Sequence, residues 1–353
     1  MAVYLPAYCT REEVKSATDI LQSADYDAHI DSAIVAAVPD IDRLCKRRFF
    51  NVDETLGWDW PNYQYAYPWR IWFDAAELAD VTVNVPVVTS GGVVIPNEQI
   101  LWGNPRYAPP YRYMELDRST VAAFGLGETP QRDVLITGTY GYWIWSRPAG
   151  ALATALSNTT GTAISITDGT DVGVGDTVTI GTERMLVSDR GAFADSGDVA
   201  TNALGTLAKG DSSISTVVAD FNVGEKIMID SEVMMIDNIG TTLNVTRSYD
   251  GTALASHDAD APIYVDRNLV VIRGSFGTIA ATHSQGTAIT ALMVPGSVHE
   301  LAIAESLNYI AQKTAAYARS IGENATPIPG GGLPDLRKRV QDAYGRKARQ
   351  RVV

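Results

Sequence analysis

Apolar residues recur every three or four positions between Asp27 and Phe50, in the sequence DAHIDSAIVAAVPDIDRLCKRRFF. This spacing places them along one face of an amphipathic helix. The face consists of Ile30, Ile34, Ala37, Val38, Ile41, Leu44 and Cys45. Pro39 lies within the segment and lacks the N–H that a helix interior uses, so we expect a kink, or two shorter helices meeting there.

The other long helical pattern runs from Ser297 to Ile321, and we expect it to pack against the first. Its apolar seam is rich in small residues, which permit close approach of two helices: Leu301, Ala304, Leu307, Ala311, Ala315 and Ala318. Two shorter helices are also expected. Thr10 and Glu13 form a capping box that opens a helix reaching about Gln22. Pro334 can open a last helix, with Leu336, Val340 and Tyr344 along one face.

Between Asn51 and Trp145 the apolar period changes to two, which is typical of half-buried strands. All seven tryptophans of the chain lie in this segment. Gly91 and Gly92 separate two valine-rich runs and predict a hairpin turn. The predicted strands are Trp58–Trp60, Trp69–Phe73, Val81–Val87, Val93–Pro96, Tyr111–Leu116 and Val134–Tyr142. We interpret the aromatic residues as core and loop packing, with a ring-stacking site for bases or sugars as the alternative.

From about Arg147 to Leu292 aromatic residues nearly vanish, and two sequence motifs recur. The stretch Asp171–Met185 returns as Asp220–Met234, forty-nine residues later. The pattern R-x-x-x-G-T-x-x-x-x-H occurs from Arg247 to His257 and again from Arg273 to His283, twenty-six residues later. A complete unit would run from the first motif into the second. Residues 209–265 form such a unit, and residues 160–190 with 266–292 would form another that is split by it. We therefore predict a β-fold nested inside a copy of itself.

Glu183, Glu232, His257 and His283 recur with these motifs, and we interpret them as structural residues that satisfy turns or backbone groups. Neither histidine has another His or a Cys at metal-ligand spacing, so we predict no metal site and no cofactor. Cys9 and Cys45 are the only cysteines and should be buried thiols.

The charge of the chain is unevenly distributed. The net charge is −13, and the last seventeen residues carry seven basic groups against one acid, a charge of +6. Subtracting +6 from −13 leaves −19 on the rest of the chain. Such asymmetry is typical of an interaction tail on an acidic body. The chain contains no run of eighteen apolar residues, so we predict no membrane-spanning helix. The N-terminal sequence MAVYLPAYCTREEV does not resemble a signal peptide.

The chain has 353 residues, and these patterns predict the α+β class and a division into three parts. Residues 1–150 with 293–322 should form a small helical bundle with β-hairpins. Residues 151–292 should form an inserted all-β domain. Residues 323–353 should form a linker with a basic C-terminal helix and tail.

Three segments carry a family resemblance: YCTREEVKSA near the N-terminus, then IDRLCKRRFF, and finally GLPDLRKRVQDAYGRKAR. With the aromatic hairpins and the late Ala-rich helix between them, they resemble the head-to-tail adaptor, or connector, proteins of tailed bacteriophages. The resemblance covers roughly residues 1–147 and 293–353. The repeated unit resembles a small β module of phage structural proteins, and its insertion here departs from the plain family pattern.

The resemblance implies a ring, usually of twelve copies, that docks beneath the portal of the virion and extends its DNA channel during genome packaging and ejection. The implied partners are the portal protein, a tail-side stopper or tail terminator protein, further copies of the chain, and double-stranded DNA that passes without sequence-specific binding. Assembly would occur in the host cytoplasm. The basic tail would grip the portal through Leu336, Arg337, Lys338, Arg339, Val340, Tyr344, Arg346, Lys347, Arg349 and Arg351. Contact between the tail and DNA phosphates is the alternative.

The residues that we expect at subunit contacts are Trp58, Trp60, Trp69, Trp72, Phe73, Tyr111 and Tyr113. An alternative function is a binding module whose β insert contacts a host glycan or a neighbouring virion protein. We do not expect an enzyme, because the sequence has no GxSxG, P-loop or HExxH motif.

Overall fold

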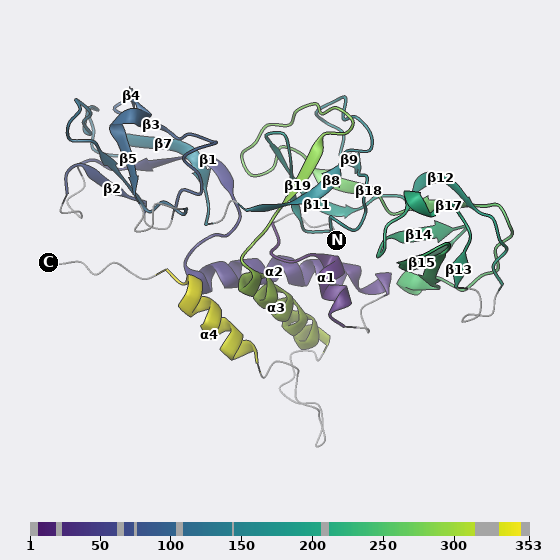
Figure 1. Cartoon of the computed structure of the whole chain (residues 1–353). Coiled ribbons are helices and arrows are strands. Elements are labelled where there is room, and N and C mark those ends of the chain that lie inside the picture. Colours follow the sequence, from purple (N-terminus) through teal and green to yellow (C-terminus); the bar gives the residue numbers. More distant parts are fainter. Residues whose placement is uncertain are drawn as a thin grey trace, which may run out of the picture.

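The computed structural model describes residues 6–18, 23–61, 67–73, 76–103, 109–142, 145–205, 212–314 and 332–346. Helices and antiparallel sheets are both present, in agreement with the predicted α+β class. Three β bodies lie in a row in Figure 1, with the helices beneath them. We call the body that contains β1 to β7 the aromatic body. Its neighbour in the row is the proximal sheet, and the body at the far end of the row is the distal sheet.

The helices form a bundle around one apolar core. Its core residues lie at helical spacing on α2 and include Ile30, Ile34 and Ile41, which pack with Val298 and Leu301 of α3. The bundle consists of α1 (Arg11–Ser16), η2 (Ala24–Tyr26), α2 (Asp27–Cys45), α3 (Gly296–Thr314) and α4 (Leu333–Tyr344). The predicted pairing of the two long helices, far apart in sequence, is thus confirmed.

Two details of the bundle differ from the sequence predictions. Helix α2 is continuous through Pro39, so two separate helices do not form. On α3 the fully buried apolar side chains are Val298, Leu301 and Ala302, whereas Ala304 and Leu307 are only partly buried. The predicted residues Ala315 and Ala318 lie outside the described residues. The capping box at Thr10 is confirmed, with the Glu13 N–H donating to Thr10 Oγ1 at 3.2 Å.

The aromatic body contains two sheets that share one core. One sheet has the order β1-β7-β3-β4 and the other β2-β6-β5. The strands are β1 (Val52–Trp58), β2 (Arg70–Trp72), β3 (Val87–Ser90), β4 (Val93–Ile95), β5 (Ile100–Gly103), β6 (Tyr113–Leu116) and β7 (Val134–Tyr140), with η3 at Asn97–Gln99. Gly91 and Gly92 join β3 to β4 with φ of 56° and 82°, a backbone region that glycine adopts without strain, so the predicted hairpin is confirmed.

The predicted strand Val81–Val87 is wrong. The Asp80 carboxylate accepts hydrogen bonds from the backbone N–H groups of Thr82 at 2.8 Å and Asn84 at 2.8 Å. These bonds hold the segment in a turn, and pairing begins only at Val87, because an Asp side chain competes with strand neighbours for local N–H groups.

The proximal sheet has the strand order β8-β19-β10-β11-β18-β9. Its strands are β8 (Ser146–Ala151), β9 (Ala163–Ser165), β10 (Thr177–Ile180), β11 (Glu183–Arg190), β18 (Asn268–Ile272) and β19 (Ala288–Leu292). It starts earlier in the chain than predicted, because β8 pairs with β19 and not with the aromatic body.

The distal sheet lies in the chain between β11 and β18 and has the order β12-β17-β14-β15-β16-β13. Its strands are β12 (Ala194–Ala200), β13 (Ser213–Ile214), β14 (Lys226–Ile229), β15 (Glu232–Ile239), β16 (Leu243–Thr246) and β17 (Ala261–Val265), with η4 at Val218–Asp220 and η5 at Tyr249–Gly251. Because β12 belongs to it, this sheet too begins before the predicted residue 209.

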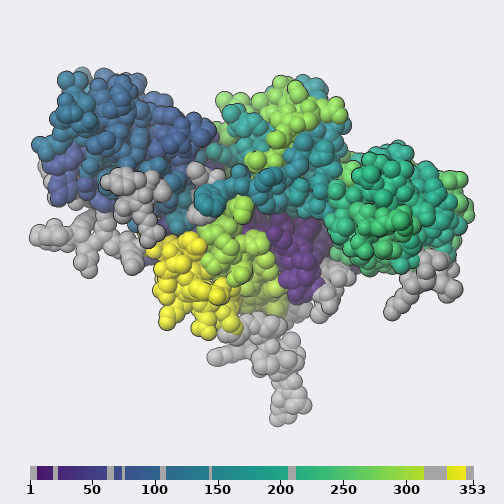
Figure 2. All heavy atoms as spheres, viewed as in Figure 1, coloured from purple at the N-terminus to yellow at the C-terminus, as the bar shows by residue number. Residues whose placement is uncertain are grey.

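The cores show which bodies are separate. The distal sheet encloses an apolar cluster of its own residues only, and Figure 2 shows it as a lobe at one end of the molecule. The proximal sheet, in contrast, contributes Val174 and Leu186 to the core of the bundle, and Ile272 and Phe276 pack against it. Residues 151–292 are therefore not one body that is separable from the helices.

Candidate functional site

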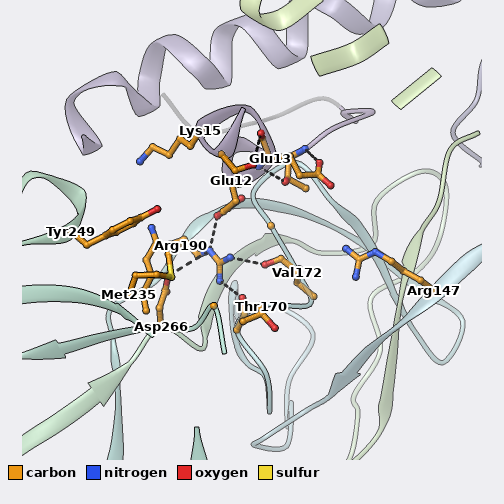
Figure 3. Close-up of a pocket in the computed structure, with 16 residues that line it drawn as sticks. Glu12, Glu13, Lys15, Arg147, Thr170, Val172, Arg190, Met235, Tyr249 and Asp266 are labelled. Carbon is orange, nitrogen blue, oxygen red and sulfur yellow. Dashed lines mark hydrogen bonds and ion pairs between the residues drawn. The ribbon is translucent and has the colours of Figure 1, made fainter. Parts of the chain in front are cut away.

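A cluster of charged and polar groups lies where α1, the proximal sheet and the distal sheet meet. A pocket of about 300 Å³ opens there. Figure 3 shows Glu12 and Lys15 on the α1 side, Arg190 between the bodies, and Met235 and Tyr249 on the distal side. No catalytic or metal motif predicted this site. Its only sequence signal was the recurrence of the loop that lines it.

Arg190 is the central side chain of this junction. It donates to Glu12 Oε1 at 2.9 Å and to the carbonyl oxygens of Val172 at 2.7 Å and Gly169 at 3.1 Å, and Asp266 lies 3.8 Å away. Burial alone would raise the pKa of Glu12, but the positive charge of Arg190 outweighs it and lowers that pKa. The pair is therefore ionised at neutral pH and holds α1 on the proximal sheet.

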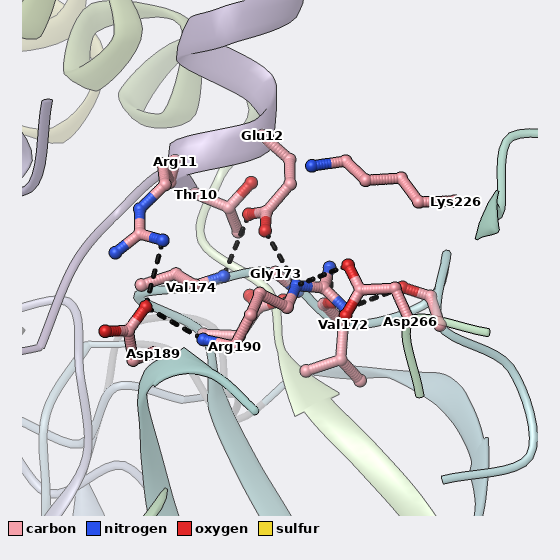
Figure 4. Close-up of polar contacts among 12 residues, drawn as sticks. Thr10, Arg11, Glu12, Val172, Gly173, Val174, Asp189, Arg190, Lys226 and Asp266 are labelled. Atoms are coloured by element: carbon pink, nitrogen blue, oxygen red, sulfur yellow. Dashed lines mark hydrogen bonds and ion pairs between the residues drawn. The ribbon is translucent and has the colours of Figure 1, made fainter. Parts of the chain in front are cut away.

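A second set of charges joins α1 and α2 to both sheets. Arg11 contacts Asp31 at 2.7 Å and Asp189 of the proximal sheet at 3.0 Å. Lys15 contacts Asp250 of the distal sheet at 3.3 Å, and Lys226 also contacts Asp250, at 2.6 Å. Figure 4 shows Arg11 with Asp189 and Glu12 with Arg190, on either side of the loop at Val174. The cations of the junction are thus paired with carboxylates.

The polar contacts of the junction hold the helices and the two sheets together, and its thiol is not reactive. Cys9 is buried, and burial raises its pKa to about 12, so its thiol is protonated and not nucleophilic at neutral pH. Within the described ranges, no three His, Cys, Asp or Glu side chains come together as a metal site would require. Cys9 and Cys45 are both free and buried, as predicted.

The repeated Glu and His residues form two matching hydrogen-bond clusters. In the distal sheet Glu232 accepts from Arg247 Nη2 at 2.7 Å and from His257 Nε2 at 2.9 Å. In the proximal sheet Glu183 accepts from Arg273 Nη2 at 2.9 Å and from His283 Nε2 at 2.8 Å. Each carboxylate also accepts two backbone N–H groups. The structural interpretation of these residues is confirmed. The sequence shows that Arg247 and Arg273 recur at the start of the second motif, but it does not show that they pair with Glu232 and Glu183.

The predicted partner-binding tail is divided between inward and outward faces. Leu336, Val340 and Tyr344 pack on the bundle: Val340 is fully buried, and the Tyr344 ring lies 6.1 Å from that of Phe49. Val340 is therefore corrected from a partner contact to a core residue, and Leu336 and Tyr344 lie half-buried on the same apolar face, because the i, i+4, i+8 spacing places the three side chains against the bundle.

The basic residues of α4 lie on its other faces. Arg337 forms an ion pair with Glu305 of α3, at 2.7 Å between Nη2 and Oε2. Lys338 and Arg339 are exposed. The backbone N–H of Arg346 donates to the Cys45 carbonyl at 2.8 Å, which fixes the end of the helix beside the end of α2. Lys347, Arg349 and Arg351 lie outside the described residues.

The predicted subunit-contact residues are also divided. Phe73 is 2% exposed in the core of the aromatic body and is corrected to a core residue. The rings of Trp58 and Trp60 pack on Phe73 and Phe124 at 5.5 Å and 4.8 Å. The half-buried Trp72 and Tyr113 lie 4.7 Å apart, and the Arg70 guanidinium lies over both rings. Trp69 carries Arg118 over its ring, and Tyr111 pairs with Leu78 through backbone hydrogen bonds.

No helix in the described part of the chain combines the length and the apolarity that crossing a membrane requires. Comparison with models of protein families finds no match to this chain, and comparison with curated protein sequences also finds none.

Proposed function

We propose that this chain is a structural virion protein, a head-to-tail adaptor that forms a ring beneath the portal and extends the DNA channel. The observation that carries the proposal is the placement of α4. One face of this helix is anchored in the bundle, while Lys338 and Arg339 face outward. The hydrogen bond from the Arg346 N–H to the Cys45 carbonyl fixes the start of the basic C-terminal segment next to the end of α2. A fixed starting point would present this segment to a partner in a defined position.

The distribution of charge supports the same role. Outside its last seventeen residues the chain carries −19. A conduit of like charge repels DNA phosphates and lets the duplex slide, whereas a +6 segment is attracted to an acidic cleft of the portal. The basic side chains of the junction form ion pairs with carboxylates of the same chain, which favours a structural protein over an enzyme.

We infer further that the proximal and distal sheets are two copies of one β module, with the distal copy inserted into the proximal one. The strand orders correspond position by position, as β10 to β14, β11 to β15, β18 to β16, and β19 to β17. Both copies have a register shift at the equivalent point, between Val187 and Asp189 and between Ile236 and Asn238. The Glu–Arg–His clusters also correspond.

The ring is tested by native mass spectrometry of the purified full-length chain, alone and with its portal. We expect a closed oligomer of about twelve copies in the presence of the portal. A chain that stays monomeric and does not bind the portal would refute the adaptor function.

The tail is tested by the double charge reversal Lys338→Glu with Arg339→Glu. Both side chains are exposed, so folding should be unchanged, while portal binding should weaken at least tenfold through charge repulsion with an acidic cleft. Arg43→Glu is the matched control, because Arg43 is 80% exposed on α2 of the same bundle. Equal binding by the double variant and the control would contradict a portal contact at α4.

A further inference from the structure

The two sheets present the same loop in two different surroundings. The proximal loop is DVGVGD at residues 171–176, and the distal loop is DFNVGE at residues 220–225. In the proximal loop the Gly175 N–H donates to Val187 O at 2.9 Å, and in the distal loop the Gly224 N–H donates to Ile236 O at 2.8 Å. This correspondence makes Val223 the equivalent of Val174.

The proximal loop binds the first turn of a helix. The Arg11 N–H, at the start of α1, donates to Val174 O at 3.0 Å. The Val174 N–H donates in return to Glu12 Oε2 at 2.9 Å, and Figure 4 shows this second contact. Val174 is 0% exposed beneath the helices. The loop therefore recognises one free backbone N–H and one carboxylate at the second helical position.

The distal loop has the same backbone shape and no such helix. Val223 is 55% exposed. Within the described ranges neither its N–H nor its C=O takes part in a hydrogen bond. Leu186, buried against the bundle, corresponds to Met235, which is half-buried and lines the junction pocket (Figure 3).

We propose that the distal sheet binds the first turn of an α-helix from another polypeptide, one that carries a carboxylate at its second helical position. The carboxylate would accept the Val223 N–H, and the helix N–H would donate to Val223 O. Lys226 replaces Thr177 of the proximal copy beside this loop, and Lys15 faces the same pocket. Both ammonium groups contact Asp250, and an incoming carboxylate would share them with that side chain. The assignment rests on the inferred duplication and goes beyond the adaptor function.

The distal surface should bind more weakly than the proximal one. Phe276 and Ile272, which pack against the bundle, correspond to Asp250 and Thr246, so less apolar area is available. The proximal loop also binds a helix of its own chain, which benefits from a high effective concentration. A free peptide lacks this advantage, and we expect a dissociation constant on the order of millimolar.

The probe is a synthetic peptide of residues 6–18 with Cys9→Ser, titrated into the isotope-labelled full-length chain and followed by methyl NMR. The expected result is saturable shifts at Val223 and Met235. A peptide with Glu12→Gln should bind about tenfold more weakly, because a charge-assisted hydrogen bond is lost. In the protein, Val223→Asp should abolish the shift at Met235, because the new carboxylate repels the carboxylate of the peptide. Val217→Asp is the control, because Val217 is a similarly exposed valine of the distal sheet.

Two results would overturn the proposal. One is a response to a scrambled peptide equal to that of the α1 peptide. The other is shifts confined to Val174 and its neighbours, which would mean that the peptide displaces α1 from the proximal sheet. Ring formation is measured separately by mass, so failure of this site leaves the adaptor function standing, and the reverse also holds.

Discussion

Glu183 and Glu232 perform the same task at equivalent positions of the two sheets. Each is 0% exposed, and each accepts hydrogen bonds from an arginine, a histidine and two backbone N–H groups. Burial alone would raise the pKa of Glu183, but the Arg273 guanidinium and the other donors outweigh it and lower the pKa to about 2. The carboxylate therefore stays charged and ties together the loop that follows β18.

Replacing Glu232 by Gln should destabilise the distal sheet strongly. The change leaves the Arg247 guanidinium buried without its counter-charge, and breaking such a buried pair typically costs about 3–5 kcal/mol. Calorimetry should show a lower unfolding temperature for the distal sheet while the rest of the chain is unaffected. Glu98→Gln, on an exposed side chain, is the control and should stay within about 0.5 kcal/mol of wild type. Equal unfolding temperatures for the two variants would show that the cluster contributes nothing.

Asp42 should make folding stability depend on pH. Burial raises its pKa to about 6, even though the Tyr8 hydroxyl donates to it at 2.6 Å. An unfolded Asp has a pKa of about 3.9, so between these two values the folded chain binds more protons than the unfolded chain. Stability should therefore fall as pH rises from about 4 to about 6 and then level off.

The measurement is urea unfolding at several pH values for the wild-type chain and for Asp42→Asn. The variant should lose the part of the slope between pH 4 and 6 that belongs to this carboxyl, because the amide does not titrate. Asp335→Asn, on an exposed carboxyl at the start of α4, should keep the wild-type slope. An unchanged slope in Asp42→Asn would contradict the assignment.

At the scale of elements, the sequence predicted best where one periodic pattern decides the structure. The apolar face of α2 needs only the spacing of Ile30, Ile34 and Ile41, and the hairpin at Gly91 needs only two glycines. Prediction failed where a contact with another part of the chain decides. Asp80 holds a valine-rich segment in a turn, and the bundle core covers the face of α4 that looked available to a partner.

The junction site shows the same limit. Glu12 looked like a residue of a capped helix, and nothing near Arg190 in the sequence indicates that the two meet across 178 positions. The recurring loop was readable as a repeat. Helix α1 covers one copy of the loop and leaves the other exposed. This difference depends on where the bundle lies, which is a property of the tertiary structure alone.

At the scale of the molecule, the contacts distinguish two kinds of attachment. The proximal sheet shares apolar core with the helices through Val174 and Leu186. The distal sheet is attached by its two chain crossings and by polar contacts such as Lys15 with Asp250 and the Gly169 N–H with Glu225. Exposing a shared apolar core costs free energy that nothing returns, whereas the charged groups of the polar contacts regain their hydration when the distal sheet is absent. The distal sheet should therefore be removable, and the proximal sheet should not.

The inferred insertion specifies where to cut. In the distal copy, β15 and β16 are joined by the short connection Gly240-Thr241-Thr242. The equivalent ends of the proximal copy are Arg190 and Leu269, so residues 191–268 can be replaced by Gly-Thr-Thr with the same register. This variant should fold, with unchanged near-ultraviolet circular dichroism from the aromatic body and one fewer calorimetric transition. Replacing residues 155–292 by a flexible linker should instead unfold the bundle, because Val174, Leu186, Ile272 and Phe276 leave its core. If the shorter deletion aggregates while the longer one folds, the distal sheet is not an insertion into the proximal one, and the bundle does not depend on the proximal sheet.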